Sequence, residues 1–188
     1  MEDGYKIKMK NVLIINICKE DLHYYEFVKP IEDIINSINV KYFTRNYKKI
    51  NKKDLEKASH IIICGTSLKD NEFIEDLDKF KWILNFDKPV LGICGGMQII
   101  GLIFGGKLKK KTEIGFYEEK FVKKFLNLEN VEKVYHLHNN YINFNYLDFE
   151  IFSGEEVSQA VKHKKKNIFG VLFHPEVRQK GLIKEFVF

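Results

Sequence analysis

The stretch Lys88-Pro-Val-Leu-Gly-Ile-Cys-Gly-Gly-Met-Gln98 decides how this chain folds, because a strand ends and a helix begins within it. Val90–Ile93 is a short apolar run of the kind that forms a buried parallel strand. An apolar helical segment, Ile99–Phe104, follows almost at once. We therefore predict a tight strand-to-helix junction centred on Cys94.

Cys94 lies in the pattern Gly-x-Cys-x-Gly, formed with Gly92 and Gly96, which is a cysteine version of a nucleophile elbow. Such a turn crowds the neighbouring backbone and exposes the sulfur at the carboxyl end of the sheet, where open α/β sheets bind ligands. The helix N-terminus favours the thiolate, and the amide of Gly95 would point toward an oxyanion. A buried structural cysteine is the alternative, but the position at the junction favours a nucleophile.

The sequence on the N-terminal side of this junction alternates apolar runs with helical patterns. We predict strands at Val12–Ile17, Val40–Phe43 and His60–Cys64, and helices at Phe27–Ile38, Lys52–Ala58 (with Asn51 as N-cap) and Glu72–Phe86. Strands that alternate with helices predict a parallel sheet covered on both faces.

The second half of the chain has short aromatic and β-branched runs separated by turn residues. These runs are Phe116–Phe125, Val131–His138, Phe149–Phe152, Val157–Lys162 and Ile168–Phe173. We expect mostly antiparallel strands, followed by a short C-terminal helix. The predicted fold is a single α/β domain over residues 1–188, an open sheet with a parallel core, helices on both faces and an antiparallel extension.

Composition excludes several classes of protein. Hydrophobic residues make up 45% of the 188 residues and aromatic residues 14%, which excludes a disordered chain. The formal charge of +5 is modest and no nucleic-acid-binding module accompanies it, so we expect no nucleic-acid partner. The apolar run in the N-terminal MEDGYKIKMKNVLIIN is too short for a signal peptide or a membrane span, and we expect a cytoplasmic protein without membrane contact.

Neither the cysteines nor the histidines suggest a metal site. Cys18, Cys64 and Cys94 are odd in number and form no CxxC pair, which argues against disulfides and a zinc ribbon, and the first two are expected to pack in the core. His136 and His138 could share one face of a strand, but without a third nearby Cys, His or carboxylate we predict no metal. No Walker or dinucleotide fingerprint is present, and we expect no cofactor.

A second motif stands at the end of the last predicted strand, in Ile168-Phe-Gly-Val-Leu-Phe-His174-Pro-Glu176. Pro175 breaks the strand, and Glu176 can lie behind the His174 ring, where a carboxylate fixes the imidazole tautomer and stabilises the imidazolium. Taken alone, this segment also fits a surface turn. Together with Cys94 it forms a Cys-His-Glu constellation for acyl transfer.

The two motifs resemble those of the class I glutamine amidotransferase family. Further blocks similar to the family are Gly105-Gly-Lys-Leu108, Glu113-Ile-Gly-Phe116 and Ala160-Val-Lys-His163, so the likeness spans nearly the whole chain. The resemblance implies a flavodoxin-like fold. It also implies that Cys94 attacks the side-chain amide of glutamine, that His174 protonates the departing ammonia and that Glu176 orients His174.

The resemblance also implies the residues that bind glutamine. They are Gly65 and Thr66 with Gly95 in the oxyanion hole, and Gln98, His138 and Asn139 around the substrate. Thr66 stands where the family has glycine, and its Cβ would resist a positive φ. Leu137 stands where many members have serine.

Length and layout are most similar to the stand-alone glutaminase subunit of GMP synthetase. We expect a glutaminase subunit that passes ammonia to a synthetase partner. Two alternatives remain: a stand-alone hydrolase of γ-glutamyl amides or peptides, and a catalytically weak regulatory subunit.

Overall fold

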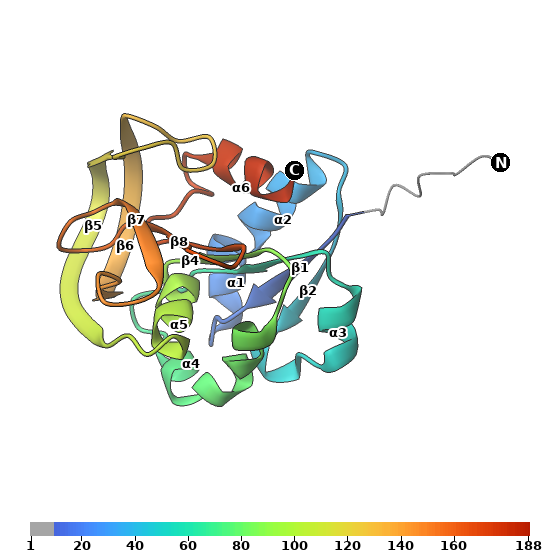
Figure 1. The fold of residues 1–188 in the computed structure, drawn as a ribbon. Coiled ribbons are helices and arrows are strands. Elements are labelled where there is room, and N and C mark those ends of the chain that lie inside the picture. The colour runs from blue at the N-terminus through green and yellow to red at the C-terminus, as the bar shows by residue number, and fades with distance from the viewer. Residues whose placement is uncertain (1–9) are drawn as a thin grey trace.

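The computed structural model describes residues 10–188, and the first nine residues lie outside the described part, together with the start of the N-terminal stretch considered above. A seven-stranded sheet in the order β2-β1-β3-β4-β9-β8-β7 forms the centre of the molecule (Figure 1). Its strands are β1 (Asn11–Asn16), β2 (Lys41–Asn46), β3 (His60–Ile63), β4 (Val90–Ile93), β7 (Phe149–Ser153), β8 (Ala160–His163) and β9 (Ile168–Val171). Neighbours from β2 to β9 are parallel, whereas β7, β8 and β9 pair antiparallel. The predicted flavodoxin-like sheet with an antiparallel extension is confirmed.

Helices cover both faces of the sheet. They are α1 (Asp21–Phe27), α2 (Lys29–Asn36), α3 (Lys52–Lys57), α4 (Glu72–Glu75), the 3-10 helix η2 (Leu77–Asn85), α5 (Gly95–Ile103) and α6 (Lys180–Val187), with a short 3-10 turn η1 (Tyr47–Lys49). Side chains of β1 alternate between the faces: Val12 and Ile14 pack with α1, α2 and α6, whereas Leu13 and Ile15 pack with η2 and α5. Successive side chains of a strand point to opposite faces of the sheet. Because helices bury both faces, each of these four side chains packs in an apolar layer.

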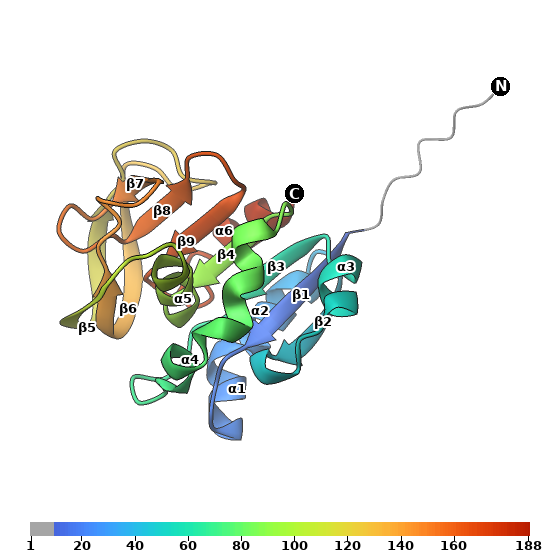
Figure 2. The same cartoon turned by 60° about the horizontal axis from the view of Figure 1, so that its bottom comes forward.

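A separate two-stranded antiparallel sheet is formed by β5 (Leu108–Lys120) and β6 (Val131–Ile142). Figure 2 shows this hairpin at the end of the molecule opposite β2, beside α5 and the antiparallel strands. The register of the hairpin shifts between Lys110 and Glu113, which is a β-bulge or a similar irregularity. The run predicted at Val131–His138 lies within β6. Only the first part of the run predicted at Phe116–Phe125 lies in β5, which begins eight residues before the predicted start and ends at Lys120.

Two predicted helices differ from the structure. The segment Phe27–Ile38 is split at Val28, and α1, which precedes it, was not predicted. The predicted helix Glu72–Phe86 is helical over most of its length, but it breaks at Asp76, and only α4 is α-helical whereas η2 is a 3-10 helix. The physical reason is spacing, because Phe80 and Ile83 are three residues apart and both fully buried, which suits three residues per turn.

Other local predictions agree with the structure. Asn51 caps α3 through a capping box with Asp54. No helix among residues 10–188 has the length and apolar character needed to cross a membrane.

Candidate active site

Cys94 occupies a strained turn between β4 and α5. Its φ of 48° and ψ of −103° place a non-glycine residue in a region that side chains rarely adopt. The flanking glycines are required sterically: a Cβ on Gly96 would lie 2.3 Å from the Ile63 carbonyl oxygen, and one on Gly92 would lie 2.6 Å from the backbone of Gly96. The structure therefore contains the elbow that the glycine pattern predicts.

Sheet topology brings His174 to Cys94, although 80 positions separate them in the sequence. Strands β4 and β9 are parallel neighbours, with Ile93 opposite Val171, so their carboxyl ends meet at one edge. The Cys94 amide donates a hydrogen bond to the Val171 carbonyl at 2.8 Å. Gly65, just after β3 on the other side of β4, touches both residues: a Cβ there would lie 2.7 Å from His174 Cε1 and 3.3 Å from Cys94 Cβ.

His174 is buried and held from two sides. Its Nδ1 lies 2.7 Å from Glu176 Oε1, and the Phe27 ring packs against the imidazole with centroids 5.4 Å apart. Burial lowers the pKa of His174, but the Glu176 carboxylate and Cys94 outweigh it and raise this pKa well above its ordinary range. Within the described residues the second ring nitrogen, Nε2, has no hydrogen-bond partner. The imidazole is thus oriented by a carboxylate on one nitrogen and free to exchange a proton on the other.

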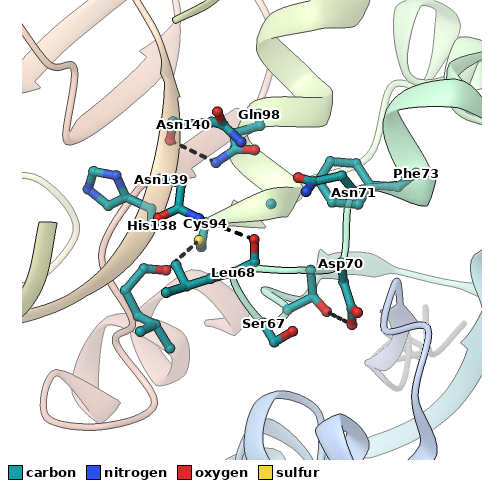
Figure 3. A pocket seen from close by; sticks show the side chains of 13 residues that line it. Ser67, Leu68, Asp70, Asn71, Phe73, Cys94, Gln98, His138, Asn139 and Asn140 are labelled. Atoms are coloured by element: carbon teal, nitrogen blue, oxygen red, sulfur yellow. Dashed lines mark hydrogen bonds between the residues drawn. The ribbon is translucent and has the colours of Figure 1, made fainter. Parts of the chain in front are cut away.

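The thiol faces a small pocket between the loop after β3 and strand β6. The pocket encloses about 20 Å³, room for about one water molecule. Its lining includes Thr66, Ser67, Leu68, Asp70, Asn71, Phe73, Cys94, Gly95, Gln98, Leu137, His138, Asn139 and Asn140. The Asn139 amide donates to the Leu68 carbonyl at 3.3 Å and bridges the two walls beside the Cys94 sulfur (Figure 3). The bridge therefore narrows the space beside the sulfur.

The residues predicted to bind substrate gather at this pocket, but their side chains differ in orientation. The Gln98 amide donates to the Asn140 carbonyl at 2.9 Å and so ties α5 to β6. The His138 imidazole points away from Cys94 (Figure 3), so any substrate contact at this position comes from its backbone. Cys94 Sγ instead lies 3.6 Å from the Leu137 carbonyl oxygen.

Thr66 belongs to a buried polar network that the sequence did not reveal. Its hydroxyl donates to Asp70 Oδ2 at 2.7 Å, and the same oxygen accepts from the Lys19 amide and lies 2.8 Å from His23 Nδ1. Burial raises the pKa of Asp70, but these hydrogen bonds outweigh it and hold the pKa below its ordinary value. Thr66 itself is not among the positive-φ residues of the described chain, so its Cβ is accommodated.

Replacing Thr66 with valine is expected to lower the free energy of unfolding by about 1–3 kcal/mol, because Asp70 loses a buried donor while the side-chain shape is kept. The folded-state pKa of Asp70 is depressed, so its contribution is present above the unfolded pKa and lost as pH falls through the folded pKa. The deficit should be full at pH 7 and shrink in acid, as pH falls through the lowered pKa of Asp70. Urea denaturation at pH 7 and in acid measures it. Thr112→Val, at an exposed position, is the control, and an equal deficit in both variants would contradict the assignment.

The other two cysteines are suited to packing. Burial raises the pKa of Cys18 to about 11 and that of Cys64 well above its ordinary value, so both thiols stay protonated at neutral pH. Both are free and buried, as predicted for core residues.

On the β5–β6 hairpin, the structure groups Glu113, His136 and His138, with one ligand-type atom of each within 4.8 Å of the others. The expectation that no third ligand lies near the two histidines is wrong, because β5 carries Glu113 beside them. Burial lowers the pKa of His136, and it lowers that of His138 to about 4, so both imidazoles are neutral at pH 7.

The comparisons with known proteins agree with this geometry. The family model "Glutamine amidotransferase class-I" matches residues 23–188, and the chain belongs to this family. A protein from Thermoplasma acidophilum, described as a GMP synthase subunit, superimposes with a TM-score of 0.82 at 21% identity, over 95% of this chain and 92% of that one. A glutamine amidotransferase from Thermotoga maritima does so with a TM-score of 0.71 at 21% identity, over 95% and 81%. At this identity the two structures show a shared fold.

Sequence relatives carry a more particular name, that of a subunit of the glutamine-hydrolysing GMP synthase. The subunit from Methanosphaera stadtmanae is 39% identical over 105 residues, which are 51% of this chain and 55% of that protein. The subunit from Picrophilus torridus is 34% identical over 131 residues, 65% and 70% of the two chains. The chain spans about half the length of most relatives that carry this name.

Proposed function

We propose that residues 1–188 form a single glutamine amidotransferase domain that works in the cytoplasm as the glutaminase subunit of a synthetase. The observation that carries the proposal is the strained Cys94 turn next to an imidazole whose Nδ1 lies 2.7 Å from the Glu176 carboxylate. A strained cysteine is costly, and such residues cluster at functional sites. Family membership supports glutamine as the substrate.

In the proposed reaction the Cys94 sulfur forms a bond to the side-chain amide carbon of glutamine. The tetrahedral oxyanion is met by the Gly95 amide and the loop that contains Gly65 and Thr66. His174 transfers its proton to the amide nitrogen, the carbon–nitrogen bond breaks, and ammonia leaves a γ-glutamyl thioester. A water molecule then gives a proton to His174 and attacks the thioester, which releases glutamate and restores the thiolate. The balance is glutamine plus water to glutamate plus ammonia.

Around the reacting atoms, Gln98, Asn139 and the backbone at His138 are the proposed substrate contacts. They line the pocket of about 20 Å³, which the Asn139–Leu68 bridge spans. We expect the loop after β3 to separate from β6 when glutamine binds. Docking of a partner on this edge of the sheet is a physical means of opening it, since binding shifts the equilibrium toward the conformation the partner prefers.

The relatives indicate the partner. Because the chain resembles glutamine-hydrolysing subunits of GMP synthase, we propose that ammonia passes to the synthetase subunit of such an enzyme. The test is glutamate release from glutamine by the chain in isolation and with that synthetase from the same organism, with and without the synthetase substrates. The expected result is slow hydrolysis in isolation and acceleration in the complex.

Two other outcomes separate the alternatives. Fast hydrolysis of γ-glutamyl amines by the isolated chain, with glutamine a poor substrate, would identify a stand-alone γ-glutamyl hydrolase. A complex in which Cys94 is neither labelled by a glutamine-analogue alkylator nor needed for activity would identify a regulatory subunit, which the closed pocket favours.

Replacing Glu176 with glutamine is expected to lower kcat for glutamine at least about 100-fold, since positioned acid–base groups contribute roughly 10²–10⁴-fold. The carboxylate raises the pKa of His174, so its removal lowers that pKa. Because His174 must carry a proton to release ammonia, the alkaline limb of the pH–rate profile should move to lower pH. The profile of kcat measured in the complex checks both effects. Glu185→Gln, at an exposed position in α6, should leave the profile unchanged, whereas an unshifted profile in Glu176→Gln would exclude this role.

A further inference from the structure

We propose that Glu113, His136 and His138, on the β5–β6 hairpin, bind a divalent transition-metal ion, with Zn²⁺ as the best match. Two imidazoles and one carboxylate are a ligand set that zinc takes in proteins, with a further position left for water. The proposed ion takes no part in the glutaminase chemistry, and the proposal does not rest on that function.

The register of the hairpin builds this cluster. Beyond the irregularity at Lys110–Glu113, Glu113 pairs directly with His138, and His136 follows two residues away on the same face of β6. Glu113 Oε2 lies 3.1 Å from His136 Nδ1 and 3.0 Å from His138 Nε2. A tetrahedral ion with bonds of about 2.0–2.1 Å separates its ligand atoms by roughly 3.3 Å, so small side-chain shifts suffice.

The hydrogen bonds of the cluster are incomplete, which a purely structural network would avoid. Both imidazoles are fully buried. Within residues 10–188, His138 Nδ1 has no hydrogen-bond partner, and the contacts of His138 Nε2 with Glu113 Oε2 and of His136 Nε2 with Glu119 Oε1 lack hydrogen-bond geometry. An unpaired buried polar atom costs about 1–3 kcal/mol. A metal ion bound by His138 Nε2 and His136 Nδ1 would give His138 Nε2 a partner. It would also fix the tautomer of both rings.

Neighbouring groups fit this arrangement. His136 Nε2 lies 3.4 Å from Glu119 Oε1, the position of a carboxylate that orients a ligating imidazole. Lys111 binds the other oxygen of Glu113, Oε1, at 3.2 Å, which leaves Oε2 for the ion. The amide of Gln159 donates to Oε2 at 3.0 Å and would help to hold the carboxylate in place.

The site would secure the strand that positions both halves of the active site. The Tyr135 carbonyl accepts from the His174 amide at 2.8 Å, and the Leu137 carbonyl lies 3.6 Å from Cys94 Sγ. His136 and His138 alternate with these residues along β6. A bound ion would therefore hold the segment of β6 that carries the Tyr135 and Leu137 carbonyls.

The test is calorimetric titration of the full chain with Zn²⁺ after chelator treatment, together with thermal unfolding. We expect one ion per chain and a rise in Tm. Glu113→Gln should weaken binding by at least the roughly 10–100-fold that loss of an outer-shell partner costs, and abolish the rise in Tm. Glu118→Gln, at an exposed position of β5, is the matched control and should bind as the wild type does.

Two further variants distinguish zinc binding at the proposed site from zinc binding at Cys94. His136→Gln tests a second ligand if Glu113→Gln proves poorly folded by circular dichroism. Cys94→Ala should retain zinc binding. Absence of binding to the wild type, or binding that survives Glu113→Gln and His136→Gln but is lost in Cys94→Ala, would overturn the proposal.

Discussion

Cys94→Ala should reduce the rate of glutamine hydrolysis by at least about 10⁴-fold. Loss of the nucleophile lowers the rate by this order of magnitude in hydrolases with a comparable catalytic triad. Alanine removes the sulfur that would form the thioester, and neither buried cysteine can replace it, because burial holds the pKa of Cys18 and of Cys64 high. The substitution should change stability little, since alanine keeps the Cβ and the backbone strain of the turn is the same in both proteins. Glutamate release in the complex measures the loss.

The matched control is Cys18→Ala, which removes a buried thiol whose sulfur lies 3.8 Å from the Gly65 carbonyl oxygen. It should retain activity and remain labelled by a glutamine-analogue alkylator. Mass spectrometry should find one adduct on the wild type and on this control, and none on Cys94→Ala. Hydrolysis at the wild-type rate by Cys94→Ala would show that another group carries the chemistry.

Gly65→Ala has the second large expected effect, a loss of about 100-fold or more in kcat/KM, which is what a displacement near 1 Å can cost a reacting group. The new Cβ would lie 2.7 Å from His174 Cε1. The ring cannot move away freely, because Glu176 holds Nδ1 and Phe27 packs on its face. Glutaminase kinetics and Tm, measured together, separate a displaced imidazole from a general loss of stability.

Gly181→Ala is the control for Gly65→Ala. Its Cβ would meet the end of the Asn127 side chain at 2.6 Å, a group that can rotate away. Wild-type kinetics are expected there. Should Gly65→Ala also behave as the wild type, the His174 ring would have room to shift, and the close approach would not be a constraint on activity.

Much of the fold follows from local patterns. Buried parallel strands read as continuous apolar runs, and β4 agrees with the predicted bounds. The 3-10 helix η2 and the early start of β5 were missed because both depend on what the side chains pack against. Phe80 and Ile83 are placed by the core, and the lysines that open β5 are exposed and carry no apolar period.

The sequence by itself determined the elbow at Cys94 and the His174–Glu176 pair, since steric demands on glycine and the spacing of a strand end are local properties. Only the tertiary structure decided how these parts meet. The parallel pairing of β4 with β9 places His174 beside Cys94, and the Asn139–Leu68 bridge closes the pocket. Glu113 joins His136 and His138 through the register of β5 on β6. Contacts across strands depend on pairing and register, which no periodicity within one segment encodes.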